Sequence, residues 1–137
     1  MLPLSVRTIR LTLHLLSVTV WVGGQITLLG LLPAVRAAGG DLGRQVGRQF
    51  NRVAWPAFGL AVLTGLWNIS TLDLANFPTN YQVTLFVKLL LVALSGLGAF
   101  LHGQSTSTVG IAVWGAVGLL SALAAVLFGV QIASFGR

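Results

Sequence analysis

Four long apolar runs, separated by short polar or proline- and glycine-containing segments, dominate the pattern of this sequence. The runs cover about residues 11–32, 53–72, 83–101 and 109–134. Each is close to the roughly 20 apolar residues that a helix needs to cross the hydrocarbon core of a bilayer. No segment alternates with the period of two that marks a half-buried strand. The pattern therefore predicts one domain over residues 1–137, an all-α, integral membrane four-helix bundle with antiparallel, up-down connections.

Proline lies near the end of the first run and at the start of the second. Arg7 and Arg10 introduce the first run, and we expect Pro33 to stop it after residue 32. This run is longer than the apolar core of about 7–15 residues in a signal peptide, which favours an uncleaved span. Pro56 falls in the first turn of the second run, where a helix tolerates proline.

Composition narrows the class of protein further. The chain is 55% hydrophobic and 7% charged, with a mean hydropathy of +0.92, whereas a soluble domain carries roughly 25% charged residues. These values exclude a water-soluble enzyme or binding module. The chain has no cysteine, and Met1 is its single methionine, which excludes disulfides, thiolate metal sites and iron–sulfur clusters. The net charge of +6 comes mostly from arginines near the ends of the runs. Arginines there bind lipid headgroups, so we predict no nucleic-acid partner.

The loop after the first run carries an amphipathic pattern over about residues 42–52. Its apolar residues repeat on one side at helical spacing: Leu42, Val46, Phe50 and Val53. Its arginines repeat every four residues on another side: Arg44, Arg48 and Arg52. We expect a helix that lies in the membrane interface and leads into the second span. Two roles stay open for the arginines. They bind anionic headgroups, or Arg48 or Arg52 turns inward to neutralise a carboxylate or a propionate.

The distribution of arginines also favours one orientation. The first loop carries four arginines, and the face with both termini and the second loop carries three. Asp73 belongs to that second face. The positive-inside rule then places the first loop in the cytoplasm and both termini outside.

Two ionisable residues lie inside the predicted spans, where such residues are costly unless they have a partner or a function. His14 and Lys88 each sit a few residues into helices that run in the same direction, so we expect them at a similar depth. Asn68 reaches that level from the second span, with Thr64 one turn deeper. We therefore expect a semi-polar cleft near one membrane face, with the stripe from His14 continuing through Ser17, Trp21 and Gln25. The simpler alternatives are that Lys88 snorkels to the interface and that His14 is an interfacial histidine.

The remaining polar and small residues are assigned structural roles. His102 lies at the opposite end of the third run from the level of His14, too far to share one metal ion or haem, and is expected to be an ordinary loop residue. The fourth run has no ionisable residue in its interior, so its expected role is structural. Glycines in the first, third and fourth runs are expected to let helices approach closely.

Four segments, in order, resemble the membrane domain of the copper resistance protein D (CopD) family. They read LHLLSVTVWVGG from Leu13, RQFNRVA from Arg48, LTGLWN from Leu63 and TLFVKLL from Thr84. The resemblance covers about three quarters of the chain and extends to the fourth run only in hydropathy. It implies a four-helix unit of a bacterial-type plasma membrane that serves copper uptake or tolerance. The histidine of the first span and the lysine of the third are also similar to those of the HemJ-type protoporphyrinogen oxidases. That similarity implies haem b at His14 and Lys88.

The chemistry of the candidate residues separates the two cofactors. Copper(I) paths favour thiolate and thioether ligands, so a copper-conducting role is weakened, although His14 stays a candidate metal ligand. A haem needs one axial imidazole, which His14 would supply. It also needs a cation for a propionate, from Lys88, Arg48 or Arg52, and an apolar or aromatic wall, from Trp21. The iron would then be five-coordinate, or its sixth ligand would come from Lys88, Asn68 or a second protomer.

Three functions stay open at this point. The first is copper homeostasis or haem-b-linked redox work at the membrane. The second is a haem-dependent porphyrinogen oxidase, and the third is a cofactor-free structural or interaction subunit. The expected partners are the lipid bilayer and either a second copy of the chain or another membrane or periplasmic protein.

Overall fold

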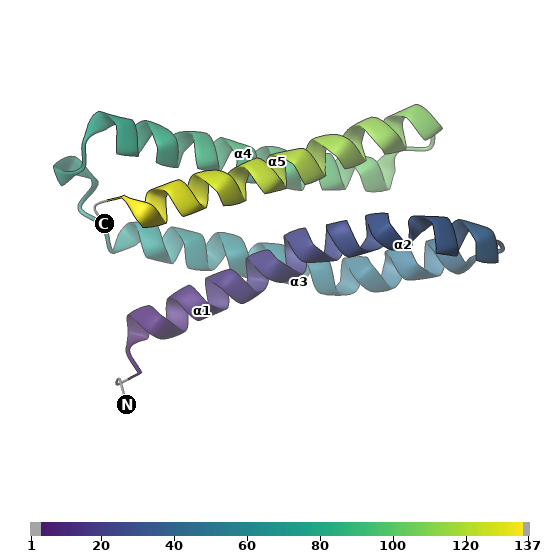
Figure 1. Ribbon diagram of the computed structural model, residues 1–137, viewed down its shortest axis with the longest axis horizontal. Helices are drawn as coiled ribbons and strands as arrows, with labels where there is room; N and C mark the ends of the chain where they lie inside the picture. The colour runs from purple at the N-terminus through teal and green to yellow at the C-terminus, as the bar shows by residue number, and fades with distance from the viewer. Residues whose placement is uncertain (1–3, 136–137) are drawn as a thin grey trace. The chain divides into compact units, whose positions relative to one another are not determined.

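The computed structural model describes residues 4–135, which form helices and short connections without a β-strand (Figure 1). The elements are α1 (Val6–Val18), the π-helix η1 (Thr19–Gly23), α2 (Gly24–Ala38), α3 (Leu42–Ser70), the 3-10 helix η2 (Leu74–Asn76), α4 (Thr79–Gln104) and α5 (Thr108–Ser134). Because α1, η1 and α2 are continuous, the described residues contain four helices long and apolar enough to cross a membrane. The all-α prediction and the four apolar helices are thus confirmed.

The chain divides into two units. The first ends at Leu72 and holds α1, η1, α2 and α3, whereas the second begins at Asp73 and holds η2, α4 and α5. Each unit has its own packing and is described by itself.

In the first unit, the long helix formed by α1, η1 and α2 packs along α3 (Figure 1). Its start is capped by Ser5, whose hydroxyl accepts the Thr8 N–H at 3.1 Å. The prediction that Pro33 stops this helix is wrong, because the helix continues through it to Ala38. Proline removes a single N–H donor, which a long apolar helix tolerates. The helix ends instead where Gly39 and Gly40 adopt φ values of 66° and 61°, a conformation that favours glycine.

The π-helix η1 brings Trp21 into an aromatic cluster with α3. The Trp21 ring lies 4.4 Å from Phe58 and 5.5 Å from Trp55, measured between ring centroids. The side-chain amide of Gln25 donates to the Trp21 carbonyl at 3.0 Å, which satisfies a backbone acceptor of the π turn. Trp21 is buried, so this cluster is the main aromatic contact between the two long helices of the unit.

Helix α3 contains both the predicted amphipathic segment and the second span without a break. Part of its apolar side contacts α2 within the unit. A Cβ atom on Gly24 would lie 2.5 Å from Cε2 of Phe50. Because glycine has no Cβ, the phenyl ring of Phe50 can pack on the backbone of α2 at this position. The segment is therefore packed on another helix at Phe50, and is not simply an apolar face laid on lipid.

In the second unit, α4 and α5 pack against each other, and the chain turns back between them at residues 105–107 (Figure 1). The helices are closest at Gly98, where a Cβ atom would lie 2.6 Å from the backbone nitrogen of Gly118. Close packing through glycine is confirmed here, whereas Gly30 in α2 has no atom within 4 Å of such a Cβ. The start of α5 is capped by Ser107, which accepts the Gly110 N–H at 3.0 Å.

Candidate functional site

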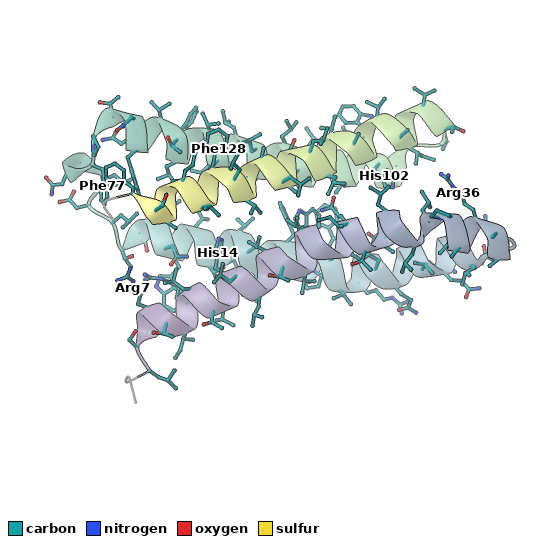
Figure 2. The ribbon with its side chains drawn as sticks, viewed as in Figure 1. Arg7, His14, Arg36, Phe77, His102 and Phe128 are labelled. Carbon is teal, nitrogen blue, oxygen red and sulfur yellow. The ribbon has the colours of Figure 1, made fainter. Side chains whose placement is uncertain are left out.

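The candidate site of the first unit is centred on His14, which is half-buried on α1. In Figure 2, His14 lies on the long helix between Arg7 at one end and Arg36 at the other, nearer to Arg7. Its Nδ1 atom is 3.0 Å from the Ala61 carbonyl oxygen and 3.0 Å from the Thr64 hydroxyl oxygen, both on α3. Two residues that lie 47 and 50 positions away in sequence therefore fix one nitrogen of the ring.

These contacts determine which ring nitrogen carries the hydrogen. A carbonyl oxygen can only accept, so the bond to Ala61 requires a hydrogen on Nδ1. The Thr64 hydroxyl donates to the Leu60 carbonyl at 2.6 Å, which leaves its oxygen as an acceptor toward His14 as well. In the neutral ring the lone pair then lies on Nε2. An Nδ1–H bond to a carbonyl is the usual arrangement behind a histidine that ligates a metal through Nε2.

The imidazole also packs closely against the backbone of α3 at Gly65. A Cβ atom on Gly65 would lie 3.2 Å from Cε1 of His14, so the ring occupies space that any other residue at position 65 would contest. Thr64 beside it is buried, at 3% exposure. The residue that meets His14 is thus Thr64, which residue counting places one turn deeper than His14 and Asn68. Gly65 is a further residue that shapes the site.

Arg10 also belongs to this site, which the sequence pattern did not predict. It was expected to bind headgroups at the helix end, but its side chain is buried, at 9% exposure. Its Nε donates to Oδ1 of Asn68 at 2.5 Å, and its guanidinium carbon lies 5.7 Å from the centre of the Trp67 ring. Arg10 precedes His14 by four residues and so lies on the same face of α1. The four-residue spacing between Arg10 and His14 is therefore a sequence pattern from which the place of Arg10 in the site could have been predicted.

Asn68 contacts Arg10, one turn before His14 on α1. Its side-chain oxygen accepts the bond from the guanidinium. The predicted semi-polar cleft, which includes Lys88 of the second unit, stays a prediction. An apolar groove of about 290 Å³ follows α1 and α3, and it is lined by Ser17 among aliphatic residues such as Leu13 and Leu60, but not by His14.

Lys88 belongs to α4 in the second unit and is half-buried there. Its side chain extends over α5, because a Cβ atom on Gly129 would lie 3.1 Å from Nζ. Within residues 4–135 the ammonium forms no hydrogen bond and no ion pair. Its predicted convergence with His14 joins residues of different units and stays a prediction.

The arginines at the start of α3 lie on the surface. Arg44 pairs with Asp41 at 2.5 Å, and Arg48 approaches the same carboxylate at 3.7 Å with a side chain that is 62% exposed. Arg52 is exposed as well. This placement favours headgroup binding for Arg48 and Arg52, and the inward-turned arginine of the unit is Arg10.

His102 is part of a helix and not of a loop. It lies in the last turn of α4, and its Nδ1 is 2.7 Å from the Ile111 carbonyl oxygen of α5. The expectation of a loop residue is wrong because α4 extends to Gln104, three residues beyond the predicted end of the span. His102 therefore ties the two helices of its unit together near their connection.

Comparison with protein-family models, with curated proteins and with solved structures finds no match. Among residues 4–135, no group of three or more histidine, cysteine, aspartate or glutamate side chains is placed to hold a metal ion. The donor set of the site is one imidazole, one buried guanidinium and small polar side chains. Such a set suits a cofactor that brings most of its own ligands, as a haem does.

Proposed function

We propose that this chain is a multi-pass protein of a bacterial-type plasma membrane that binds haem b through His14 and serves electron transfer there. The observation that carries the proposal is the pair of contacts from Nδ1 of His14 to Ala61 and Thr64. They hold the ring in the tautomer and orientation that an axial ligand requires. The proposal includes insertion of all four helices in an up-down, antiparallel bundle.

The residues of the first unit fit the needs of a haem. His14 would hold the haem iron through its imidazole, and the buried Arg10 would supply a cation one turn away on the same helix face. When bound, haem b supplies reversible one-electron chemistry at the iron. Apolar helix surface around the site lowers the local dielectric, which strengthens the interaction of Arg10 with any acidic group.

The protein's own contribution is to fix the ligand and raise its basicity. The Ala61 carbonyl and the Thr64 hydroxyl share the Nδ1–H, which increases electron density on the imidazole. Gly65 lets the ring sit against α3 without a clash. The resemblance to the HemJ-type oxidases implies Lys88 as a further haem-binding residue, and Trp21 is proposed as an aromatic wall.

Copper handling is the second candidate, supported by the resemblance to the CopD family. A copper ion would have His14 as its protein ligand, but the set of donors around that histidine is otherwise hydroxyl, amide and carbonyl oxygen. These donors are poor ligands for copper(I). We therefore place haem ahead of copper, and metal content measured on the same sample separates them.

The test is an absorption spectrum of protein purified in detergent from haem-replete cells, oxidised and dithionite-reduced, with iron and copper measured on the same preparation. We expect a Soret band and reduced b-type bands that His14→Ala abolishes. The matched control is His102→Ala, because His102 also bonds a carbonyl through Nδ1 yet lies at the other end of a span. Colourless wild-type protein without stoichiometric iron, or equal loss in both variants, would refute the haem proposal.

A further inference from the structure

Arg10 carries a positive charge that the described chain does not neutralise. The sequence has two acidic residues, Asp41 and Asp73. Asp41 pairs with Arg44, and Asp73 accepts a hydrogen bond from Asn76 at 2.7 Å. Among residues 4–135, Arg10 forms no ion pair, and its one hydrogen-bond partner is the neutral amide of Asn68. A buried cation without a counter-charge is costly, so a bound anion would stabilise it.

The geometry around Arg10 leaves hydrogen-bond donors for that anion. Its Nε is used by Asn68, whereas the two Nη groups form no hydrogen bond with the described residues. Oδ1 of Asn68 accepts the bond from the guanidinium. The Nδ2 NH2 group of the same side-chain amide is therefore a second donor of this cluster. A guanidinium fork beside an amide donor matches the oxygens of a phosphate.

The position of the cluster indicates the source of the phosphate. Arg10 is the fifth residue of α1, so it lies about 6 Å along the helix from its first residue. Trp67, which faces the guanidinium, is 45% exposed, and tryptophan is enriched at the headgroup level of membranes. Arg7, one turn earlier, is exposed and adds positive charge at the same end. Basic pockets between helices at this level bind anionic headgroups.

We propose that Arg10 and Asn68 form a binding site for the headgroup phosphate of an anionic phospholipid. The site holds one lipid between the first turns of α1 and the last turns of α3, with Trp67 against the glycerol region. The inference rests on the membrane location proposed above. It assigns the charge of Arg10 to a lipid phosphate in place of an acidic group of haem, and haem ligation by His14 takes no part in it.

The test compares Arg10→Gln with Arg7→Gln, which removes the same charge from the same end of α1 but from an exposed side chain. Each protein is reconstituted in phosphatidylcholine bilayers with and without phosphatidylglycerol, and retained lipid is counted by native mass spectrometry. We expect wild type and Arg7→Gln to retain phosphatidylglycerol, and Arg10→Gln to lose about tenfold or more in affinity. Inorganic phosphate added to neutral bilayers is expected to leave the unfolding temperature of wild type unchanged, which separates lipid from free phosphate.

A second variant guards against a simple folding defect. Asn68→Asp puts a carboxylate where the amide oxygen lies 2.5 Å from Nε, so the protein supplies its own counter-charge. We expect this variant to fold in neutral bilayers and to lose the preference for phosphatidylglycerol. Equal lipid loss in Arg7→Gln and Arg10→Gln, or an undiminished preference in Asn68→Asp, would overturn the proposal. Loss of haem in Arg10→Gln with unchanged lipid retention would also overturn it and would identify the anion as a haem carboxylate. Failure of wild type to enter neutral bilayers would instead refute the membrane location.

Discussion

Replacing Gly98 by alanine tests whether α4 and α5 are held together by backbone contact. The added Cβ would lie 2.6 Å from the nitrogen and 2.8 Å from the Cα of Gly118, and 3.1 Å from the Trp114 carbonyl oxygen. All three neighbours are backbone atoms of α5. Because no side chain can rotate away, the only response is for the helices to separate or shift.

The distance by which the two helices must separate determines how much stability Gly98→Ala loses. Ordinary van der Waals contact begins near 3.4 Å, so the Gly118 nitrogen must recede by about 0.8 Å, the difference between 3.4 and 2.6 Å. A shift of that size loosens the neighbouring contacts of a close-packed seam. Overpacking of this kind costs about 1–3 kcal/mol. We expect Gly98→Ala to lower the free energy of unfolding by that amount.

The assay is equilibrium unfolding of the purified protein in mixed micelles, followed by circular dichroism. The control is Gly103→Ala in the same helix, where a Cβ would meet no atom within 4 Å. That change is expected to be neutral or stabilising by less than about 1 kcal/mol, because alanine favours the helix over glycine. Equal stability of the two variants would show that Gly98 does not set the helix spacing.

Three further substitutions probe other contacts. Thr64→Val removes an acceptor of the His14 Nδ1–H and is expected to cost about 0.5–1.5 kcal/mol of unfolding free energy, whereas Thr64→Ser keeps the hydroxyl and should retain most of it; identical losses would contradict the bond. Trp21→Ala is expected to cost about 3–5 kcal/mol in thermal unfolding because the ring is buried against two aromatic residues, and Trp21→Phe should cost clearly less. Ser107→Ala removes the cap of α5 and is expected to cost about 1 kcal/mol in the same assay; the neighbouring Thr106→Ala should leave stability unchanged, and a loss there of similar size would argue against the cap.

The apolar runs were sufficient to predict the helices, because a span that must satisfy its own backbone leaves few alternatives. The ends were predicted less well. Pro33 is a strong breaker in water-soluble helices, yet α2 continues through it until Gly39 and Gly40 supply positive φ values. The π-helix at Thr19–Gly23 has no local sequence signal that distinguishes it from α-helix.

The residues of the site were predicted in part. Arg10 was missed, and the reason is physical. Residue counting identified His14, Thr64 and Asn68 as polar residues of one region, but it matched His14 with Asn68, whereas the contact is with Thr64, one turn away. Burial of Arg10 did not follow, because an arginine near a helix end reaches headgroups or turns inward depending on which face its partner helix covers. Asn68 is the partner that decides between these outcomes, and it lies 58 residues away. Pairing at that separation depends on the rotation of two helices about their axes.

The contact between Gly98 and Gly118 also limits how the second unit can move. Sliding of packed helices proceeds by side chains changing rotamer and exchanging neighbours. A seam made of backbone offers no rotamers to exchange, so α4 and α5 cannot shear past each other at this point. The seam therefore fixes the register of α4 against α5 within this unit.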